Sequence, residues 1–379
     1  MQKIRVYLTR NLRRSILRGH PWVYRDAIQA PEQVERASLA RVEDKSGFLA
    51  WGIYDPNSVL ALRILSFESA PPSEFYFFER FKMAYRLRSP VRQSDTNGYR
   101  LINGEGDRFP GLVCDLYGDT AVLQLDGQGP SEFWNRAWIK HWITETTGCS
   151  RILEKKRREE SVLEEPEVMI RENGVRFQVN LEKGQKTGFF FDQRENRQFI
   201  RSLALEKRVL NLFSYTGGFS VYAGLGGAKQ VTSVDISEGA IRSAHQNWLL
   251  NGLEGDLHEA CVEDVSEYLS QHRDLRDLVI VDPPSFAHSR EQREGAKRKY
   301  VEIFAMAAQR VTPGGLLALS SCSSQIDFND FHQINEEALA KARRRGQLIR
   351  VSGQGMDHPF PHVCPELRYL KFACFVLDG

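Results

Sequence analysis

The second half of the chain alternates short apolar runs with longer helix-like stretches, and this alternation restricts the fold more than any other feature. From Arg208 onward the apolar runs are VLNLF, VTSVD, DLVIVD and GGLLALSS, and stretches such as EGAIRSAHQNWLLNG separate them. The pattern predicts an α/β fold, a parallel sheet with helices on both faces. Ligands of such sheets bind at the carboxyl ends of the strands, so the residues after each apolar run are the candidate site.

The preceding part of the chain is richer in β-like runs. Residues 1 to about 70 hold runs such as IRVYL and GFLAWGIY between turn signals. Two prolines in SAPPSEF then precede an aromatic stretch with helical spacing, SEFWNRAWIKHWITETT predicts a second helix, and VMIRENGVRFQVNL predicts a hairpin. We therefore predict a β-rich domain over residues 1–72, an α+β middle domain over 73–188 and an α/β domain over 189–379.

Composition excludes several classes of protein. The 379 residues carry a net charge of +2 and are 41% hydrophobic, so any nucleic-acid surface must be local. No segment approaches the ~18 consecutive apolar residues of a membrane span, and the N-terminus lacks an apolar signal core, so we expect a cytoplasmic protein without membrane contact. Six widely separated cysteines without a CxxC pair, and nine histidines without an HExxH group, indicate neither a disulfide framework nor a metal site.

Polar residues or glycines follow the first three strands of the predicted sheet. Gly217 and Gly218 after the first strand would let the backbone approach a ligand, although a plain tight turn explains them equally well. Asp235 after the second strand is placed to accept hydrogen bonds from a ribose diol, or to cap the helix that begins at Ser237. Glu263 and Asp264 after the third strand suit an adenine amino group, with helix capping as the alternative.

The fourth strand gives the stronger signal, because DLVIVDPPSF delivers Asp282 directly into two prolines. Proline fixes φ and removes a backbone donor, so Asp282 and the carbonyls beside it are held as acceptors in the predicted cleft. A structural turn is the alternative reading of this motif. Three acceptor-bearing strand ends in succession favour a binding site.

Together these features resemble class I S-adenosylmethionine-dependent methyltransferases. The motifs GQKTGFFFDQRENR, DPPSFAHSR, SSCSS, MDHP and LKFAC make the chain similar to bacterial PUA-domain methyltransferases that form 5-methylcytosine in 23S rRNA, and GHPWVY resembles the start of their PUA-like RNA-binding domain. The resemblance spans nearly the whole chain, and its Lys186–Arg197 motif is specific. It implies a C-terminal Rossmann-like methyltransferase domain with a mainly parallel seven-stranded sheet, an N-terminal PUA-like domain and a small α+β middle domain.

The resemblance also assigns roles in binding S-adenosylmethionine. The Phe213–Gly218 turn would hold the methionine part, Asp235 the ribose, and Glu263 or Asp264 the adenine. The full set of cofactor-binding residues that it implies is Asp192, Arg194, Phe213, Ser214, Tyr215, Thr216, Gly217, Gly218, Asp235, Ile236, Ser237, Glu263, Asp264, Val265 and Asp282.

Cys322 in SSCSS matches the cysteine nucleophile of the resembled family. Cytosine C5 is a poor nucleophile, so a thiolate must first attack C6, which is covalent catalysis. Asp282, Pro283 and Pro284 would hold the base, and Phe286 would stack on it. The alternative for Cys322 is core packing, since free cysteine is often buried. Ser285 follows the prolines where two-cysteine enzymes have a second cysteine, so the sequence fits a single-cysteine mechanism.

Four basic stretches are candidates for RNA contact, although each is also typical of a solvated helix face. They are Arg5–Arg18, Lys155–Arg158, Lys297–Lys299 and the ARRRG segment near Arg343. The first and third are favoured, because one lies in the PUA-like domain and the other follows the strand with Asp282. The expected partner is 23S rRNA or the assembling large subunit; a homodimer is suggested by the resemblance alone.

Two other functions remain open at this stage. A purine-nitrogen methyltransferase would use a similar sheet and DPP-type loop without a covalent intermediate, leaving Cys322 passive. A noncatalytic RNA-binding or ribosome-assembly factor would keep the fold without methyl transfer, although the acidic strand ends argue against it.

Overall fold

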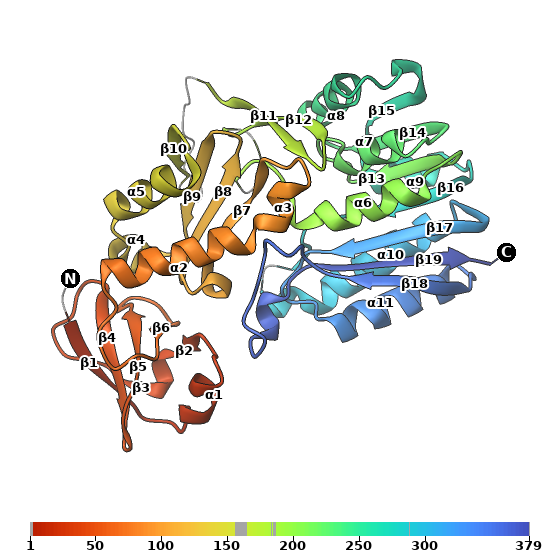
Figure 1. Ribbon diagram of the computed structural model, residues 1–379. Helices are drawn as coiled ribbons and strands as arrows, with labels where there is room; N and C mark the ends of the chain where they lie inside the picture. Colours follow the sequence, from red (N-terminus) through yellow and green to blue (C-terminus); the bar gives the residue numbers. More distant parts are fainter. Residues whose placement is uncertain (1–2, 156–164, 183, 185–186, 288, 379) are drawn as a thin grey trace. The chain divides into compact units, whose positions relative to one another are not determined.

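The computed structural model describes residues 3–155, 165–182, 184, 187–287 and 289–378 (Figure 1). The chain divides into two compact units. Unit 1 comprises Met1–Gly174, Val179–Phe191 and Met356–Leu367, and unit 2 comprises Val175–Gln178, Asp192–Gly355 and Arg368–Gly379. Unit 1 therefore takes in almost all of the two predicted N-terminal domains and also a short segment from the predicted third domain.

The N-terminal part of unit 1 is a six-stranded sheet, in agreement with the predicted β-rich module. The strands lie in the order β2-β6-β5-β4-β1-β3. Their bounds are β1 (Lys3–Leu8), β2 (Trp22–Val23), β3 (Ile28–Gln29), β4 (Ser38–Asp44), β5 (Gly47–Tyr54) and β6 (Leu62–Ser66), with the short helix α1 (Arg13–Leu17). Val6, Val42 and Leu62 are fully buried in a core of its own.

The rest of unit 1 is built on a four-stranded sheet with the order β10-β9-β8-β7. The strands are β7 (Gly98–Asn103), β8 (Leu112–Tyr117), β9 (Thr120–Leu125) and β10 (Arg151–Glu154), and the helices are α2 (Glu74–Leu87), α3 (Ser89–Gln93), α4 (Gln128–Phe133) and α5 (Arg136–Thr147). Phe77 and Phe81 of α2 are buried against this sheet, as the helical spacing predicted, whereas Phe75 is 71% exposed.

Two local predictions in this region had different outcomes. The single helix expected over SEFWNRAWIKHWITETT is wrong, because Asn135 interrupts it and caps α5 by accepting hydrogen bonds from Ala137 N and Trp138 N at 2.9 and 3.3 Å. The hairpin is confirmed: β11 (Glu167–Glu172) and β12 (Val175–Asn180) form a two-stranded sheet. Asn173 and Gly174 between them have φ of 50° and 77°, as a type I′ turn requires.

Unit 2 contains the predicted seven-stranded sheet, with the order β15-β14-β13-β16-β17-β19-β18. The strands are β13 (Arg208–Leu212), β14 (Gln230–Asp235), β15 (His258–Val262), β16 (Arg276–Val281), β17 (Val311–Ser321), β18 (Gly346–Ser352) and β19 (Lys371–Leu377). All neighbours are parallel except the pairs that β19 forms with β17 and β18. The strand order reverses direction between β13 and β16, which is where sheets of this type bind ligands.

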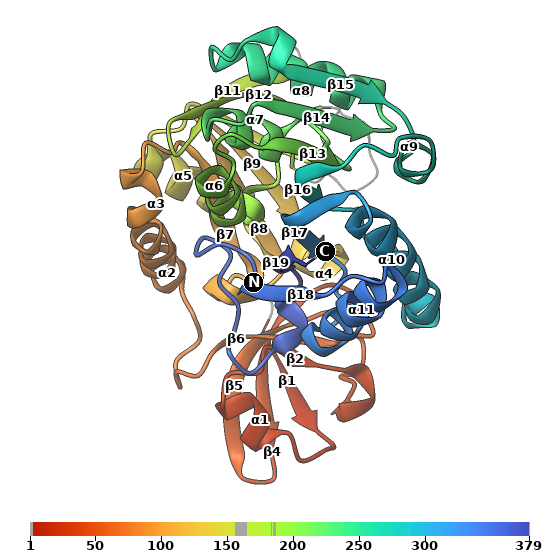
Figure 2. The same cartoon turned by 90° about the vertical axis from the view of Figure 1, so that its right-hand side faces the viewer.

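Helices cover both faces of this sheet. They are α6 (Arg194–Leu203), α7 (Gly218–Leu225), α8 (Glu238–Leu250), α9 (Val265–Gln271), α10 (Arg293–Ala308) and α11 (Phe328–Lys341). Leu278 and Ile280 of β16 pack in a core with α6, α7 and α8, whereas Val279 and Val281 pack in a core with α9, α10 and α11. Figures 1 and 2 show α6 beside α7, and α10 beside α11. Burial of both strand faces explains why this run is apolar throughout rather than alternating.

None of the described helices is both long and apolar enough to cross a membrane.

Candidate active site

The predicted site residues of unit 2 lie at the carboxyl ends of adjacent strands. β13 pairs with β14 on one side and with β16 on the other, and β14 pairs with β15. Asp235 ends β14, Glu263 and Asp264 follow β15, and Asp282 follows β16. Asp282 N donates to Leu212 O at 3.4 Å, which ties the start of the DPPSF motif to the strand that leads into the Phe213–Gly218 turn.

The Phe213–Gly218 turn has an unusually constrained backbone. Phe213 and Tyr215 have φ of 58° and 47°, values that residues with a side chain seldom adopt. Gly217 has φ of 78°, and a Cβ added there would lie 2.8 Å from the Ala244 Cβ, so this position requires glycine. Positive φ at non-glycine residues costs about 1–3 kcal/mol each and is concentrated at ligand sites. Three positive φ values within residues 213–217 favour a ligand-binding turn over a plain one, and that role stays a prediction.

Polar atoms of the same turn are directed toward Asp235. Tyr215 N donates to Asp235 Oδ2 at 2.9 Å, and Ser237 N donates to Asp235 Oδ1 at 2.9 Å. The cap of α8 is Ser237, whose Oγ accepts from Ala240 N at 3.3 Å, so the capping alternative for Asp235 is wrong. Asp235 instead holds the turn in place and keeps acceptor capacity on its carboxylate. The neighbouring Ile236 side chain is 73% exposed, an apolar surface beside this acceptor.

The two acidic residues after β15 have different roles. Asp264 Oδ1 accepts from Ser266 N and Glu267 N at 2.8 and 3.2 Å, so Asp264 is the cap of α9, as the capping alternative stated. Glu263 Oε1 is buried and has no hydrogen-bond partner within the part of the chain that the structure describes. A buried acceptor without a partner is costly, so Glu263 is the better candidate of the pair for a ligand contact, and that role stays a prediction. The Val265 side chain is buried in the core.

Asp282 is held by a side chain that sequence reasoning did not assign. Gln193 Nε2 donates to Asp282 Oδ1 at 2.9 Å and to Ser320 Oγ at 3.3 Å. The Gln193 amide is oriented in turn by Asn196, whose Nδ2 donates to Gln193 Oε1 at 2.6 Å. Gln193 and Asn196 are both almost fully buried, so this network fixes the Asp282 carboxylate before any ligand arrives. The signal was present in the FFFDQRENR motif, where the glutamine had received no role.

Two residues that flank Gln193 had been predicted to lie beside the cofactor. Asp192 and Arg194 are 2% and 3% exposed. Asp192 Oδ2 accepts from Tyr369 OH at 2.7 Å, and Arg194 lies 3.3 Å from the Glu195 carboxylate. Their part in cofactor binding stays a prediction, and Lys186, at the start of the same motif, lies outside the described residues.

Cys322 follows β17 and is brought against the DPPSF motif. Its Sγ lies 4.0 Å from Pro283 O, and its side chain is partly buried rather than enclosed in the core. Pro283 is buried and Pro284 exposed. The strand ends that carry SSCSS and DPPSF therefore meet, as expected for neighbouring parallel strands β16 and β17. The core-packing alternative fits Cys374 better, since that cysteine is fully buried.

Aromatic side chains and one cation surround Phe286, the predicted base-stacking residue. The Phe286 ring centroid lies 4.7 Å from that of Tyr300 and 6.4 Å from that of Phe213. Lys299 Nζ lies 4.4 Å from the centre of the Phe286 ring. Burial raises the pKa of the Tyr300 hydroxyl, so this group stays neutral. Its oxygen accepts a hydrogen bond from Ser321 Oγ at 3.1 Å. Phe286 is partly buried among these side chains, and its role in stacking on a base stays a prediction.

Three of the four basic stretches are partly engaged in structural contacts. Lys297 pairs with Asp330 at 2.6 Å, while Arg298 and Lys299 are exposed. In the N-terminal domain Arg13 pairs with Asp44 at 2.8 Å, while Arg5 and Arg14 are exposed. Lys155 donates to Leu181 O and Gly184 O at 3.3 and 2.7 Å, and burial lowers its pKa; the rest of that stretch, residues 156–158, lies outside the described residues.

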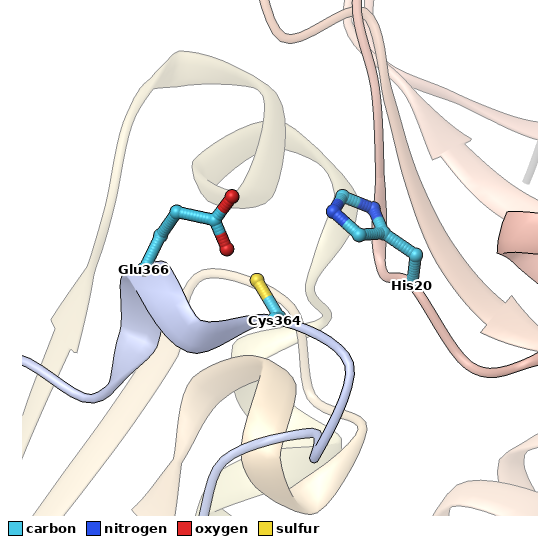
Figure 3. Close-up of side chains that lie close together, drawn as sticks. All are labelled: His20, Cys364 and Glu366. Atoms are coloured by element: carbon cyan, nitrogen blue, oxygen red, sulfur yellow. The ribbon is translucent and has the colours of Figure 1, made fainter.

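Among the described residues, one group in unit 1 brings three types of metal ligand together. His20, Cys364 and Glu366 place one potential ligand atom each within 4.8 Å of one another, and Figure 3 shows their polar ends pointing toward a common point. Burial and the Glu366 carboxylate raise the pKa of the Cys364 thiol to about 12, so the thiol keeps its proton. The thiolate is the form of cysteine that binds metal, so a protonated Cys364 does not favour a metal here, and the expectation of no metal site stays a prediction.

Comparisons with known proteins agree with this arrangement. A model of the S-adenosylmethionine-dependent methyltransferase family matches residues 143–365, and a model of PUA-like domains matches residues 6–67. Ribosomal RNA large subunit methyltransferase I of Aeromonas salmonicida is 36% identical over 388 residues, 97% of each chain. The protein of the same name from Photobacterium profundum is 37% identical over 392 residues, 98% of this chain and 99% of the relative.

A solved structure supports the fold. SMU.776, complexed with SAH, superposes with a TM-score of 0.85 at 24% identity, covering 99% of this chain and 100% of its own. The predicted combination of a PUA-like domain with a Rossmann-like methyltransferase domain is thus confirmed. The family model matches more than half of the chain, and the relatives are similar across nearly all of it. The chain therefore belongs to the S-adenosylmethionine-dependent methyltransferase family.

Proposed function

We propose that the protein methylates C5 of a cytosine in 23S rRNA, with Cys322 as the covalent nucleophile. The observation that carries this proposal is the meeting of SSCSS with DPPSF, where Cys322 Sγ lies 4.0 Å from Pro283 O beside the fixed Asp282 carboxylate. The names of the full-length relatives and the PUA-like domain support large-subunit rRNA as the substrate. In a purine-nitrogen methyltransferase the Cys322 thiol would be passive.

The residues at the strand ends fit S-adenosylmethionine. Ser214 Oγ and Glu263 Oε1 are both buried and lack hydrogen-bond partners in the described parts of the chain. Buried polar atoms are normally hydrogen-bonded, so a bound ligand would supply the missing partners. Gly217 has no side chain, so the backbone of its turn can approach the methionine part of S-adenosylmethionine. In our proposal Asp235 accepts from the ribose hydroxyls, Ile236 covers one face of the adenine, and Glu263 accepts from the adenine amino group.

Replacing Gly217 by valine is expected to weaken S-adenosylhomocysteine binding by roughly 100-fold or more. The new Cβ would lie 2.8 Å from the Ala244 Cβ, and valine is strained at φ of 78°, so the turn must move away from the ligand. Titration calorimetry measures the affinity, and Gly239→Val in α8 is the control, because nothing lies within 4 Å of a Cβ there. Equal binding by both variants would contradict the assignment of this turn.

The proposed reaction needs a nucleophile, groups that hold the cytosine ring and a methyl donor. S-adenosylmethionine supplies an electrophilic methyl group when bound. The Cys322 thiolate forms a bond to cytosine C6, and the electron density that this addition moves to C5 allows C5 to take the methyl group. Loss of the C5 proton to a base then breaks the C6–Sγ bond, which regenerates the thiolate and the aromatic ring.

The target base would be held by groups that the fold already fixes. Asp282, which Gln193 orients, and the Pro283 carbonyl are acceptors for the amino edge of cytosine. Phe286 would stack on the ring, and the exposed Lys299 beside it would contact phosphate. Because the site is at the end of a buried strand, a nucleotide must leave its stack to reach it.

A mechanism-based trap tests the proposal. A 23S rRNA transcript that contains 5-fluorocytidine should form a covalent complex with the protein in the presence of S-adenosylmethionine, since fluorine at C5 cannot leave as a proton does. Denaturing electrophoresis detects the complex, and peptide mass spectrometry should place it on Cys322. Methylation of ordinary transcript without any trapped complex, with a methylated purine as product, would overturn the proposal in favour of the nitrogen methyltransferase. Absence of methyl transfer to transcript and precursor particles would favour the noncatalytic role.

A further inference from the structure

A buried lysine lies close to Cys322, the proposed nucleophile. Lys371 is fully buried at the start of β19, and the strand register pairs it with Ser321, the residue that precedes Cys322. Its Nζ donates to Ser323 O at 2.5 Å and to Tyr369 O at 2.7 Å. The ammonium group is therefore held by two backbone carbonyls, one of which belongs to the residue that follows Cys322.

Buried ammonium groups require an anion nearby, because neutral carbonyls do not compensate the loss of hydration. Three groups place negative charge near Lys371: Cys322, Asp327 and Asp330. Asp327 is exposed, and its Oδ1 accepts from Asp330 N at 2.8 Å as the cap of α11. It is thus hydrated and already engaged.

Asp330 is neutralised from another helix. Arg293 and Lys297 of α10 both lie 2.6 Å from its carboxylate oxygens. Their pairing also holds the pKa of the Asp330 carboxyl below its usual value despite burial. Of the three anionic groups, Cys322 is therefore the one whose charge Lys371 is best placed to balance.

We propose that Lys371 is a positioning residue that holds Cys322 in its thiolate form through the electrostatic attraction of a buried ammonium group. This inference deepens the proposed function and rests on Cys322 being its nucleophile. The thiolate is the reactive form of cysteine, and a neighbouring cation is one of the ordinary ways of favouring it. Arginine in place of lysine would not fit as readily, since the fully buried site accommodates a compact ammonium group.

The arrangement has a defined pH dependence. Burial lowers the pKa of Lys371 to about 8, and the charge of Cys322 opposes that decrease. The ammonium charge is therefore present below about pH 8 and is lost as the pH rises through that value. The Tyr300 hydroxyl near Cys322 stays neutral over this range, because burial raises its pKa, so it does not substitute for Lys371. The advantage that Lys371 gives to the thiolate is accordingly largest near neutral pH.

The test measures alkylation of Cys322 by iodoacetamide in the full-length protein without RNA or cofactor, followed by mass spectrometry of the Cys322 peptide. Lys371→Met keeps most of the side-chain volume and removes the charge, and Lys371→Gln keeps a hydrogen-bond donor. Both should slow alkylation at pH 7 by about 10- to 100-fold, equivalent to a rise of one to two units in the thiol pKa. The rates of variant and wild type should converge near pH ~10, where Lys371 is neutral and the thiol of the variant is ionised.

The wild-type protein contains its own control, which does not depend on whether the variants fold. Cys261 is also partly buried, and burial with nearby carboxylates raises the pKa of its thiol to about 11. At pH 7 Cys322 should therefore be alkylated at least ~10-fold faster than Cys261. A Cys322 that titrates at or above the ordinary thiol value in the wild type, or identical pH profiles for wild type and both variants, would overturn the inference.

The outcome is separable from that of the proposed function. A trapped 5-fluorocytidine complex together with unchanged alkylation profiles would retain Cys322 as nucleophile and reject Lys371 as its partner. Shifted alkylation profiles without any trapped complex would support the Lys371–Cys322 coupling and reject cytosine C5 methylation.

Discussion

Cys322→Ala should lower methyl transfer to rRNA on the order of 10³-fold or more, because removal of a covalent nucleophile eliminates the step that activates C5. Cofactor binding should be unchanged, since Cys322 lies at the end of β17 and the proposed cofactor residues follow β13, β14 and β15. Radiolabelled methyl transfer measures the first quantity, and calorimetry with S-adenosylhomocysteine measures the second. A loss of activity without a loss of affinity separates a chemical role from damage to the fold.

Cys261→Ala is the matched control. Cys261 is also partly buried and belongs to the same sheet, but it lies within β15 rather than after β17 and packs against the hydrophobic core of unit 2. This variant should retain methyl transfer within about twofold of wild type and should still form the 5-fluorocytidine complex, with only a small packing cost. Undiminished activity of Cys322→Ala would show that the thiol is passive and would make a noncovalent mechanism the better account.

Arg88→Met should destabilise the protein by about 3–5 kcal/mol, the usual cost of leaving one member of a buried ion pair without its partner. The Arg88 side chain is fully buried, and its two terminal nitrogens each lie 2.6 Å from an oxygen of Asp107, whose side chain is 3% exposed. The same guanidinium donates to Arg100 O at 3.0 Å and to Asp357 O at 2.8 Å. Methionine fills the space but satisfies none of these acceptors. Urea unfolding followed by tryptophan fluorescence measures the change.

The double variant Arg88→Met/Asp107→Asn tests the physical reason. Asparagine removes the stranded charge and can still accept from Asn103 N, which donates to Asp107 Oδ2 at 2.7 Å. The double variant should recover part of the free energy of unfolding that Arg88→Met loses. If the losses of the two single variants simply add up, the unpaired charge is not the main cause of the destabilisation. Lys229→Met, which removes an exposed ion pair with Glu206, should leave the unfolding midpoint unchanged within error.

The strand ends of unit 2 could be predicted because each is marked by a local transition. A buried parallel strand must be apolar on both faces, so the change from LVIV to DPP locates the strand end without knowledge of the rest of the fold. The positions of Asp235, Glu263 and Asp282 follow from this rule. The roles within these positions do not, because a carboxylate that caps a helix and one that faces a ligand have the same sequence signature. Thus Asp264 is the cap of α9, while Ser237 rather than Asp235 caps α8.

The side chains that support the site were beyond sequence reasoning. Gln193 reaches Asp282 from a segment near the start of α6, and Lys371 reaches the backbone beside Cys322 from β19. Both contacts join parts of the chain that are far apart in sequence, and neither residue type has a spacing rule that would single it out. The cluster of His20, Cys364 and Glu366 is a further example, since it arises where residues from opposite ends of the chain meet.

The sequence by itself determined the α/β architecture, the strand ends that carry the candidate site and the family resemblance, because hydrophobic periodicity and short motifs are local properties of the chain. The tertiary structure decided which of those residues meet, which of them cap helices, and which buried side chains contact Asp282 and the backbone beside Cys322. The physical reason is that burial and charge compensation depend on neighbours brought together by folding. A lysine or glutamine acquires its role from the acceptor that the fold places beside it.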